Sequence, residues 1–313
     1  MENPILETRK IWEGAPHCAF TDLAYHSGQW LCCFRESDSH ALGRLGTIRV
    51  LKSTDGQCWT SAFVFSDPAL DLRDPHFSQP GDARLVLNFT GRQQADGKYL
   101  GIQSFVTFSA DGNAWDPPIA MSTDGYWVWQ IRWHAGLAYT WSRKIVEGLP
   151  YAFFRSADAI HWEPTIRLES GNETALAVLN DGRLLALRRK NDAMLGISSP
   201  PYQTWEWNQL GRFVGGPNLM VLSDGRVIAG CRYHHPDLPE DQKSYFALSI
   251  VSTDQLSMQP VITFPGGQDC GYPGMVEKDS ILWVSHYSGT KHDAAIYLTQ
   301  IPISLFPASP LNK

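Results

Sequence analysis

The 313-residue chain lacks a long apolar run and carries no basic surplus. A membrane-spanning helix needs about 20 consecutive apolar residues, and no segment approaches that length. The opening stretch, Met-Glu-Asn-Pro-Ile-Leu, also lacks the apolar core of a signal peptide. We therefore expect a cytoplasmic protein without a membrane partner. The net charge of −6 argues against a nucleic-acid partner held through phosphate contacts.

Cysteine is also sparse, with six residues at positions 18, 32, 33, 58, 231 and 270. None of them has the spacing of paired metal ligands, which favours reduced structural thiols. The neighbours His234 and His235 would point to opposite faces of a strand, so they do not predict a shared metal site either. We expect neither a metal nor another cofactor.

Helical periodicity is absent too, and a repeated turn pattern stands in its place. The pattern Ser-x-Asp-x-x-x-Trp occurs at Ser53–Trp59, Ser109–Trp115 and Ser156–Trp162. Serine and aspartate side chains can close a turn by bonding nearby backbone amides, while the tryptophan fills the gap between layers. We therefore predict that the three aspartates stabilise turns and take no part in catalysis.

A second repeat has the same phase as these turns. Short hairpin signals, each followed by an apolar run, are anchored at residues 31, 85, 137, 184, 227 and 282. Such spacing is typical of propeller blades. We predict an all-β fold, a six-bladed β-propeller of four-stranded antiparallel blades, with residues 1–313 as one domain. Residues 17–26 and 270–278 should form innermost strands, and Glu7–Trp12 should close the ring against Ile296–Ile301.

Strand direction then sorts the polar residues between the two ends of the ring. The starts of first strands and the ends of second strands meet at one end, opposite the aspartate-bearing turns. Arginines gathered there would repel one another unless an anion lay among them, so an anionic ligand is expected. The predicted substrate-binding residues are Arg35, Arg73, Asp74, Arg132, Arg188, Asn218 and Arg232.

These turns on a six-bladed ring resemble the Asp-box repeats of the sialidase superfamily. Asn172–Leu176, with Arg188 downstream, resembles the segment that carries the sialidase glutamate, and Gly271–Val276 resembles the one that carries the nucleophilic tyrosine. The resemblance implies a retaining glycosidase acting on a terminal acidic sugar, with Tyr272 as nucleophile and Glu173 as its base.

Two stretches of the chain depart from the sialidase pattern. Pro16–Asp22 lacks the arginine with which typical sialidases open their first blade. Asp38 and His40 are approximate counterparts of the acid/base aspartate. The tyrosine and glutamate make sense by themselves, because a neutral phenol can approach a sugar whose carboxylate would repel a carboxylate nucleophile.

Two other functions remain open at this point. A polysaccharide lyase would remove the proton beside a uronic-acid carboxylate, using His17 or His40 with Tyr272 as base and acid. A propeller without catalysis would only bind a glycan or a protein partner. The expected partner is a carbohydrate, and the arginines favour an anionic one. The sequence does not determine the sugar, the linkage or the oligomeric state.

Overall fold

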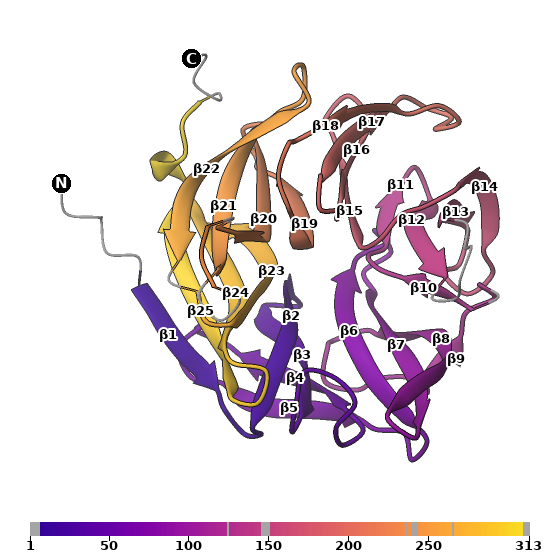
Figure 1. Cartoon of the computed structure of the whole chain (residues 1–313), viewed down its shortest axis with the longest axis vertical. Coiled ribbons are helices and arrows are strands. Elements are labelled where there is room, and N and C mark those ends of the chain that lie inside the picture. Colours follow the sequence, from indigo (N-terminus) through magenta and orange to yellow (C-terminus); the bar gives the residue numbers. More distant parts are fainter. Residues whose placement is uncertain are drawn as a thin grey trace.

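The computed structural model describes residues 7–123, 125–144, 151–235, 237–239, 243–264 and 266–308. Within this part of the chain the fold is all-β, apart from one 3-10 turn at Ile303–Leu305. The strands form sheets arranged around a central axis, so the predicted propeller arrangement is confirmed (Figure 1). In the same residues there is no helix with the length and apolar character needed to cross a membrane.

The first sheets along the chain follow the predicted hairpins. One unit contains β2 (His17–His26), β3 (Gln29–Ser37), β4 (Thr47–Ser53) and β5 (Thr60–Phe65). The next contains β6 (Leu70–Ser78), β7 (Leu85–Ala95), β8 (Lys98–Ser109) and β9 (Ile119–Ala120). The third contains β10 (Tyr126–Val128), β11 (Arg132–His134), β12 (Leu137–Lys144), β13 (Tyr151–Ser156) and β14 (Glu163–Leu168). Within each unit every strand pair is antiparallel.

The second half of the chain repeats the plan. One unit contains β15 (Thr174–Val178), β16 (Leu184–Arg188), β17 (Met194–Ser198) and β18 (Glu206–Gln209). Another contains β19 (Gly215–Val221), β20 (Val227–His234), β21 (Ser244–Ser252) and β22 (Ser257–Phe264). The last contains β23 (Asp269–Lys278), β24 (Ile281–Gly289), β25 (Ala294–Pro302) and β1 (Glu7–Trp12). A single parallel pair, His17 with Ala294, joins this last unit to the first, giving one eight-stranded sheet.

The ring closes as predicted. β1 pairs antiparallel with β25, from Glu7 opposite Gln300 to Trp12 opposite Ile296. The N-terminal strand β1 thus covers the outer edge of β25, where unpaired backbone groups would otherwise be exposed.

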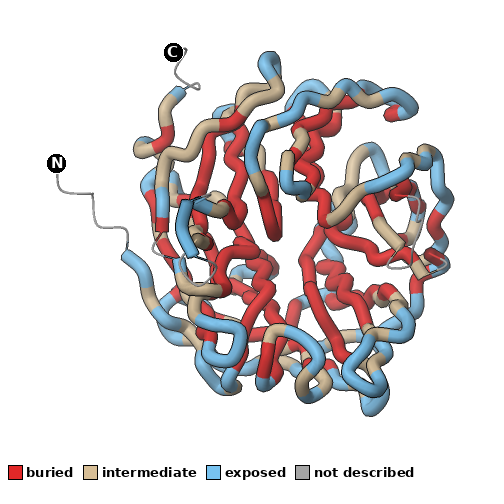
Figure 2. The backbone as a smooth tube through the Cα atoms, viewed as in Figure 1, coloured by how far each residue is buried: buried red, intermediate tan, exposed pale blue. Residues whose placement is uncertain are grey.

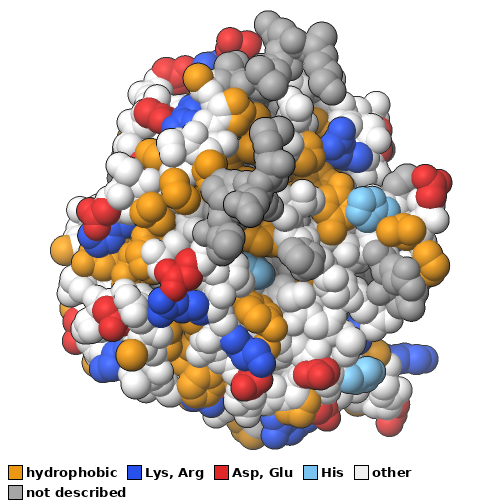
Figure 3. Space-filling model, turned by 90° about the vertical axis from the view of Figure 1, so that its left-hand side faces the viewer, with side chains coloured by type: hydrophobic (Ala, Val, Ile, Leu, Met, Phe, Trp, Pro, Cys, Tyr) orange, Lys and Arg blue, Asp and Glu red, His pale blue; other side chains and the backbone are white. Residues whose placement is uncertain are grey.

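Apolar side chains fill the spaces between neighbouring sheets. Leu187 and Leu195 of one sheet, for example, belong to the same buried cluster as Ala229 and Ala247 of the next. The inner strands are buried, whereas the outer strands and turns are exposed (Figure 2). On the side of the molecule that carries β1 and β22, basic and acidic side chains are interspersed (Figure 3).

The repeated turns have the predicted contacts. In the first copy the backbone amides of Gln57 and Cys58 donate to Asp55 Oδ1 at 2.8 and 2.9 Å, and Trp59 Nε1 donates to the Gly56 carbonyl at 3.1 Å. Asp111 and Asp158 accept the corresponding amide bonds.

The turns lie at the same end of the ring as the first hairpin of each sheet. Gln29, which opens β3 after such a hairpin, donates through Nε2 to the Asp111 carbonyl of the neighbouring sheet at 2.6 Å. The opposite end is therefore free for the polar residues that the strand direction places there.

Four innermost strands are interrupted by a β-bulge. The register shifts in β2, β6, β19 and β23, and each shift includes a residue with positive φ: Phe20 (62°), Asp74 (51°), Gly216 (55°) and Tyr272 (51°). A bulge changes the direction of a side chain without breaking the sheet. These bulges place side chains on rigid backbone close to the axis.

Candidate functional site

Tyr272 and Glu173 meet over the axis, as the sequence predicts. The Tyr272 hydroxyl donates to Glu173 Oε1 at 3.1 Å. Arg189 Nη1 lies 2.5 Å from the same carboxylate oxygen and 3.1 Å from the tyrosine oxygen. The Gly216 amide donates to Glu173 Oε2 at 3.0 Å, which fixes the second oxygen.

The electrostatics of the pair follow from burial and from the neighbouring arginines. Burial alone would raise the pKa of Glu173, but the charges of Arg189 and Arg143 and the bonds from Arg189 and Gly216 lower it to about 2. Burial and the charge of Glu173 raise the pKa of Tyr272 well above its usual range. At neutral pH the pair is therefore a carboxylate beside a neutral phenol.

A second cluster centres on Asp269, which the sequence analysis did not single out. His17 Nε2 and His40 Nδ1 lie 3.1 and 2.5 Å from its Oδ2. Arg232 Nη1 and the Tyr287 hydroxyl donate to its Oδ1 at 2.8 and 2.7 Å. These bonds and the Arg232 charge overcome burial and hold the pKa of Asp269 far below its usual range.

The ligand atoms of His17, His40 and Asp269 lie within 4.8 Å of one another, which is compatible with a metal ion. However, Arg232 already places a positive charge 2.8 Å from the same carboxylate. The four hydrogen bonds also satisfy both carboxylate oxygens. The cluster is therefore better described as a hydrogen-bonded one, and the only sequence signal for Asp269 is its place at the start of an innermost strand.

His40 has the geometry of an oriented acid/base group. With Nδ1 bonded to Asp269, its Nε2 is left as the second functional nitrogen. Burial, opposed by Asp269, lowers the pKa of His40, so the ring is neutral at pH 7. Asp38, the other predicted counterpart, instead fastens its own loop by accepting bonds from the Arg44 amide at 2.8 Å and from Ser37 and Ser39.

Arg35 and Arg73 both pair with the buried carboxylate of Asp71. Arg35 is fully buried, pairs with Asp71 at 2.8 Å, and donates to the Ser39 carbonyl. Arg73 pairs with the same Asp71 and donates to the His40 carbonyl at 2.9 Å. Both arginines therefore position the loop that carries His40.

Asp74 is a buried carboxyl without a hydrogen bond to Oδ2 in the described residues. Burial, with the charge of Glu173 adding to it, raises its pKa against the opposing effect of Arg73. A carboxyl held toward its neutral form near Glu173 can donate a proton, as general acids must.

Arg92 and Arg143 flank the Trp127 ring, 6.0 and 4.5 Å from its centroid. Across the described ranges, neither has a carboxylate within ion-pair distance, whereas Arg189 and Arg232 both do. Among the residues that the structure describes, these two positive charges near the axis therefore have no carboxylate partner.

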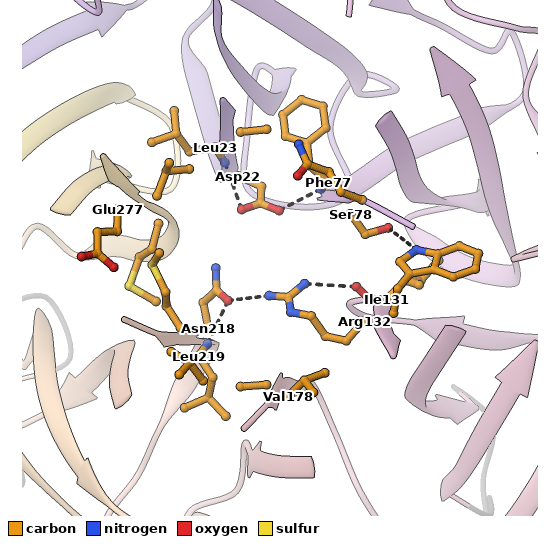
Figure 4. A pocket seen from close by; sticks show the side chains of 18 of the residues that line it. Asp22, Leu23, Phe77, Ser78, Ile131, Arg132, Val178, Asn218, Leu219 and Glu277 are labelled. Carbon is orange, nitrogen blue, oxygen red and sulfur yellow. Dashed lines mark hydrogen bonds between the residues drawn. The ribbon is translucent and has the colours of Figure 1, made fainter. Parts of the chain in front are cut away.

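Three of the predicted binding residues lie elsewhere. Arg188 points away from Glu173 because neighbouring residues in a strand face opposite sides, and its neighbour Arg189 takes the predicted place. Arg132 and Asn218 contact each other at 3.0 Å in a cavity of about 410 Å³ that is lined by the hairpin halves of the inner strands (Figure 4). This cavity is at the end of the aspartate-bearing turns. Trp129, which donates through Nε1 to the Pro217 carbonyl at 3.3 Å, lies 5.7 Å from the Tyr272 ring.

Comparisons with known proteins agree with the architecture. No protein-family model matches the chain, and no curated protein matches it. Among solved structures, a protein of unknown function from Dyadobacter fermentans has a TM-score of 0.79 at 18% identity, covering 95% of this chain and 99% of that one. Trypanosoma rangeli sialidase with the inhibitor DANA has a TM-score of 0.70 at 14% identity, covering 92% and 55%. NanB sialidase from Streptococcus pneumoniae has a TM-score of 0.68 at 10% identity, covering 98% and 72%.

The fold is that of the sialidase propeller. At these identities the likeness concerns architecture alone, and the chain spans little more than half of the Trypanosoma rangeli protein. The side chains at the axis are what can indicate the function of this chain.

Proposed function

We propose that the chain is a six-bladed propeller, counting the eight-stranded sheet as two blades, and a retaining glycosidase acting on a terminal acidic sugar. The observation that carries the proposal is the hydrogen bond from Tyr272 to Glu173, with Arg189 touching both. A phenol, a carboxylate and a guanidinium at one point suit attack on a sugar that itself bears a carboxylate.

In the proposed reaction the Tyr272 oxygen attacks the anomeric carbon while its proton passes to Glu173. His40 gives a proton to the departing oxygen as the glycosidic bond breaks; it does so from its protonated form, which is the minor form at pH 7 because burial lowers its pKa, so turnover should rise as the pH falls below 7. A water molecule then gives a proton to the now neutral His40 and attacks the same carbon. The bond to Tyr272 breaks, Glu173 returns its proton to the tyrosine oxygen, and the configuration is retained.

Binding of the substrate carboxylate to the arginines would itself help Glu173 to accept the tyrosine proton. A bound carboxylate that engages Arg189 would weaken the hold of this guanidinium on Glu173. The pKa of Glu173 would then rise, which makes it a better acceptor for the tyrosine proton. Arg232, 5.4 Å from the Tyr272 ring, and Arg143 would hold the same anion.

A uronate lyase is the second candidate, and the His40–Asp269 contact favours it. An imidazole oriented by a buried carboxylate is a suitable base for the proton beside a carboxylate, and nearby arginines would stabilise the enolate-like charge. In this case Tyr272 would protonate the leaving oxygen, and Glu173 would serve only to position it.

The test compares Tyr272→Phe, Glu173→Gln and His40→Ala on acidic-sugar glycosides and uronate oligosaccharides. For the glycosidase, kcat should fall by orders of magnitude in Tyr272→Phe and nearly as much in Glu173→Gln, with substrate affinity within a few-fold. Tyr202→Phe, a change at the hairpin end where the hydroxyl bonds the Gly182 carbonyl, is the matched control and should leave kcat unchanged.

The products separate the two chemistries. A lyase leaves an unsaturated sugar that absorbs ultraviolet light, and Glu173→Gln would then be mild while His40→Ala is severe. Undiminished turnover in Tyr272→Phe would contradict both mechanisms. Absence of turnover by the wild type on every substrate, with glycan binding present, would favour a propeller that only binds glycans.

A further inference from the structure

The loop of residues 38–46 between β3 and β4 carries His40, the proton donor of the proposed reaction. Within the described residues no strand pairing supports this loop, since β3 ends at Ser37 and β4 begins at Thr47. A proton donor has to keep its nitrogen within hydrogen-bond reach of the departing oxygen. Contacts with neighbouring units therefore have to hold the loop in place.

Asp71, in β6 of the next unit, is fully buried and accepts hydrogen bonds on both carboxylate oxygens. Its Oδ1 accepts from Arg35 Nε and from the Gly46 amide, both at 2.9 Å. Its Oδ2 accepts from Arg73 Nη1 at 3.1 Å and from the Tyr99 hydroxyl at 3.0 Å. A Cβ added at Gly46 would lie 2.6 Å from Asp71 Oδ1, so this close approach requires glycine. The carboxylate is thus occupied by the protein itself.

The three side chains that bond Asp71 also contact the backbone of the loop. Arg35 Nη1 donates to the Ser39 carbonyl at 2.8 Å, Arg73 Nη1 donates to the His40 carbonyl at 2.9 Å, and the Tyr99 hydroxyl accepts from the Leu42 amide at 3.3 Å. From the other side, the His40 amide donates to the Lys291 carbonyl at 2.8 Å. The backbone of His40 is therefore held between two neighbouring units, and Asp71 organises one of the two attachments.

This attachment depends on the negative charge of Asp71. Burial would raise the pKa of Asp71, but the charges of Arg35 and Arg73 lower it, so the carboxylate is ionised at neutral pH. Burial and the charge of Arg73 lower the pKa of Arg35, which means that the two guanidiniums are close enough to repel each other. Without the carboxylate between them, two buried cations would lose their shared partner and move apart.

We propose that Asp71 is a positioning residue that keeps the His40 imidazole beside Asp269 and thereby aligns the proton donor with the departing oxygen. The inference rests on the proposed glycosidase function and adds a residue that does not touch the substrate. Tyr272 and Glu173 bond each other, Arg189 and Gly216, and in the described chain neither bonds Asp71. Loss of Asp71 should therefore impair protonation of the leaving group more than attack by Tyr272.

The first experiment compares two leaving groups on sialic acid, p-nitrophenol and methanol. A p-nitrophenolate departs without a proton, whereas the methyl glycoside needs general acid catalysis, which is worth about 100-fold or more. Asp71→Asn should lower kcat/KM, which reports cleavage of the glycosidic bond, roughly tenfold or more for the methyl glycoside and less than about twofold for the p-nitrophenyl glycoside. Asp67→Asn is the matched control, because Asp67 only accepts from the Ala69 and Leu70 amides before β6, and it should change neither value.

A double mutant tests whether Asp71 acts through His40. His40→Ala should show the same preference for the p-nitrophenyl glycoside, and adding Asp71→Asn should increase that preference no further. If the two losses multiplied instead, Asp71 would act by another route and the proposal would be overturned.

A second readout does not depend on turnover. Nuclear magnetic resonance of isotope-labelled histidine follows the titration of His40 in the substrate-free protein, with His40→Ala identifying the signal. In the wild type burial lowers the pKa of this imidazole. In Asp71→Asn the ring should leave its buried position, so its pKa should rise toward the usual range. In Asp67→Asn the titration should match that of the wild type.

Equal losses for both glycosides, or an unchanged His40 titration in a folded Asp71→Asn, would overturn the proposal. If Asp71→Asn does not fold, Tyr99→Phe takes its place, because it removes one bond to Asp71 and one to the loop while keeping the ring, and it should show the same preference severalfold. If the wild type hydrolysed neither glycoside, the proposed glycosidase function would fail, while the His40 titration would still decide whether Asp71 positions the imidazole.

Discussion

Replacing Glu173 by glutamine tests whether the buried carboxylate is as strongly stabilised as its contacts indicate. Glutamine keeps the size of the side chain and can still accept from the Gly216 amide. It cannot balance the charge of Arg189, which would become a largely buried cation with no partner. The change should therefore destabilise the fold as well as stop catalysis.

The magnitude follows from the pKa of Glu173. Burial opposes ionisation, but Arg189 and the other contacts bring the pKa from 4.5 to about 2. Since one pKa unit is worth about 1.4 kcal/mol, the ionised group contributes about 3 kcal/mol. Because the folded pKa is the lower one, this contribution is complete above about pH 4.5 and is lost as the pH falls toward 2.

The assay is urea denaturation of wild type and Glu173→Gln at several pH values from 3 to 7. The difference in unfolding free energy should be about 3 kcal/mol at pH 7 and should shrink steadily below pH 4.5. Glu163→Gln, an exposed glutamate paired with Arg155, is the control and should change stability by no more than about 0.5 kcal/mol. A difference that does not depend on pH would refute the reasoning.

Three further outcomes are expected. Asp269→Asn should lower the unfolding free energy by about 3–5 kcal/mol in denaturant titrations, because a buried guanidinium loses its partner, and a change below 1 kcal/mol would contradict the proposed cluster. Gly216→Ala should reduce both stability and turnover, since the added Cβ would lie 2.4 Å from the Tyr272 ring; Gly211→Ala, also at positive φ but with open space around it, should reduce stability only slightly. Asp111→Ala should lower the melting temperature yet leave kcat unchanged, and a fall in kcat would mean that the aspartate-bearing turns are not mere scaffolding.

The propeller arrangement could be predicted because its signals are local. Each Ser-x-Asp turn is closed by bonds within a few residues, as at Asp55, and each hairpin is marked by its own turn residues. Recurrence of such signals at a constant phase then predicts the repeated sheets. The pairing of Glu7–Trp12 with the last strand also follows, because a ring leaves only one place for that segment.

Individual site residues were harder to predict, because a strand reverses its face at every residue. The choice between Arg188 and Arg189 depends on the exact register of the strand end, which the repeat pattern does not determine. Arg132 and Asn218 were misplaced for a related reason. The repeat pattern does not determine how far along its strand each residue lies, and both lie close enough to the hairpins to face the other end of the axis. The resemblance of two segments to those of the sialidase superfamily predicted that Tyr272 and Glu173 act together, and the structure brings them into contact.

The only local signal for Asp269 was its place at the start of an innermost strand. Its neighbours, Gly-Gly-Gln and Cys, do not mark it as a functional residue. Its partners His17, His40 and Arg232 come from three distant parts of the chain, so their convergence appears only in three dimensions.

The pairing of β1 with β25 affects how the protein is made. The ribosome synthesises β1 long before β25, yet each completes the hydrogen bonding of the other. The earlier sheets can form one by one as they emerge, but the unit that contains Tyr272 and Asp269 must wait until β25 has been synthesised. During synthesis the site therefore stays unfinished, and a nascent chain stalled before Ala294 would hold most of the ring without its closing strand.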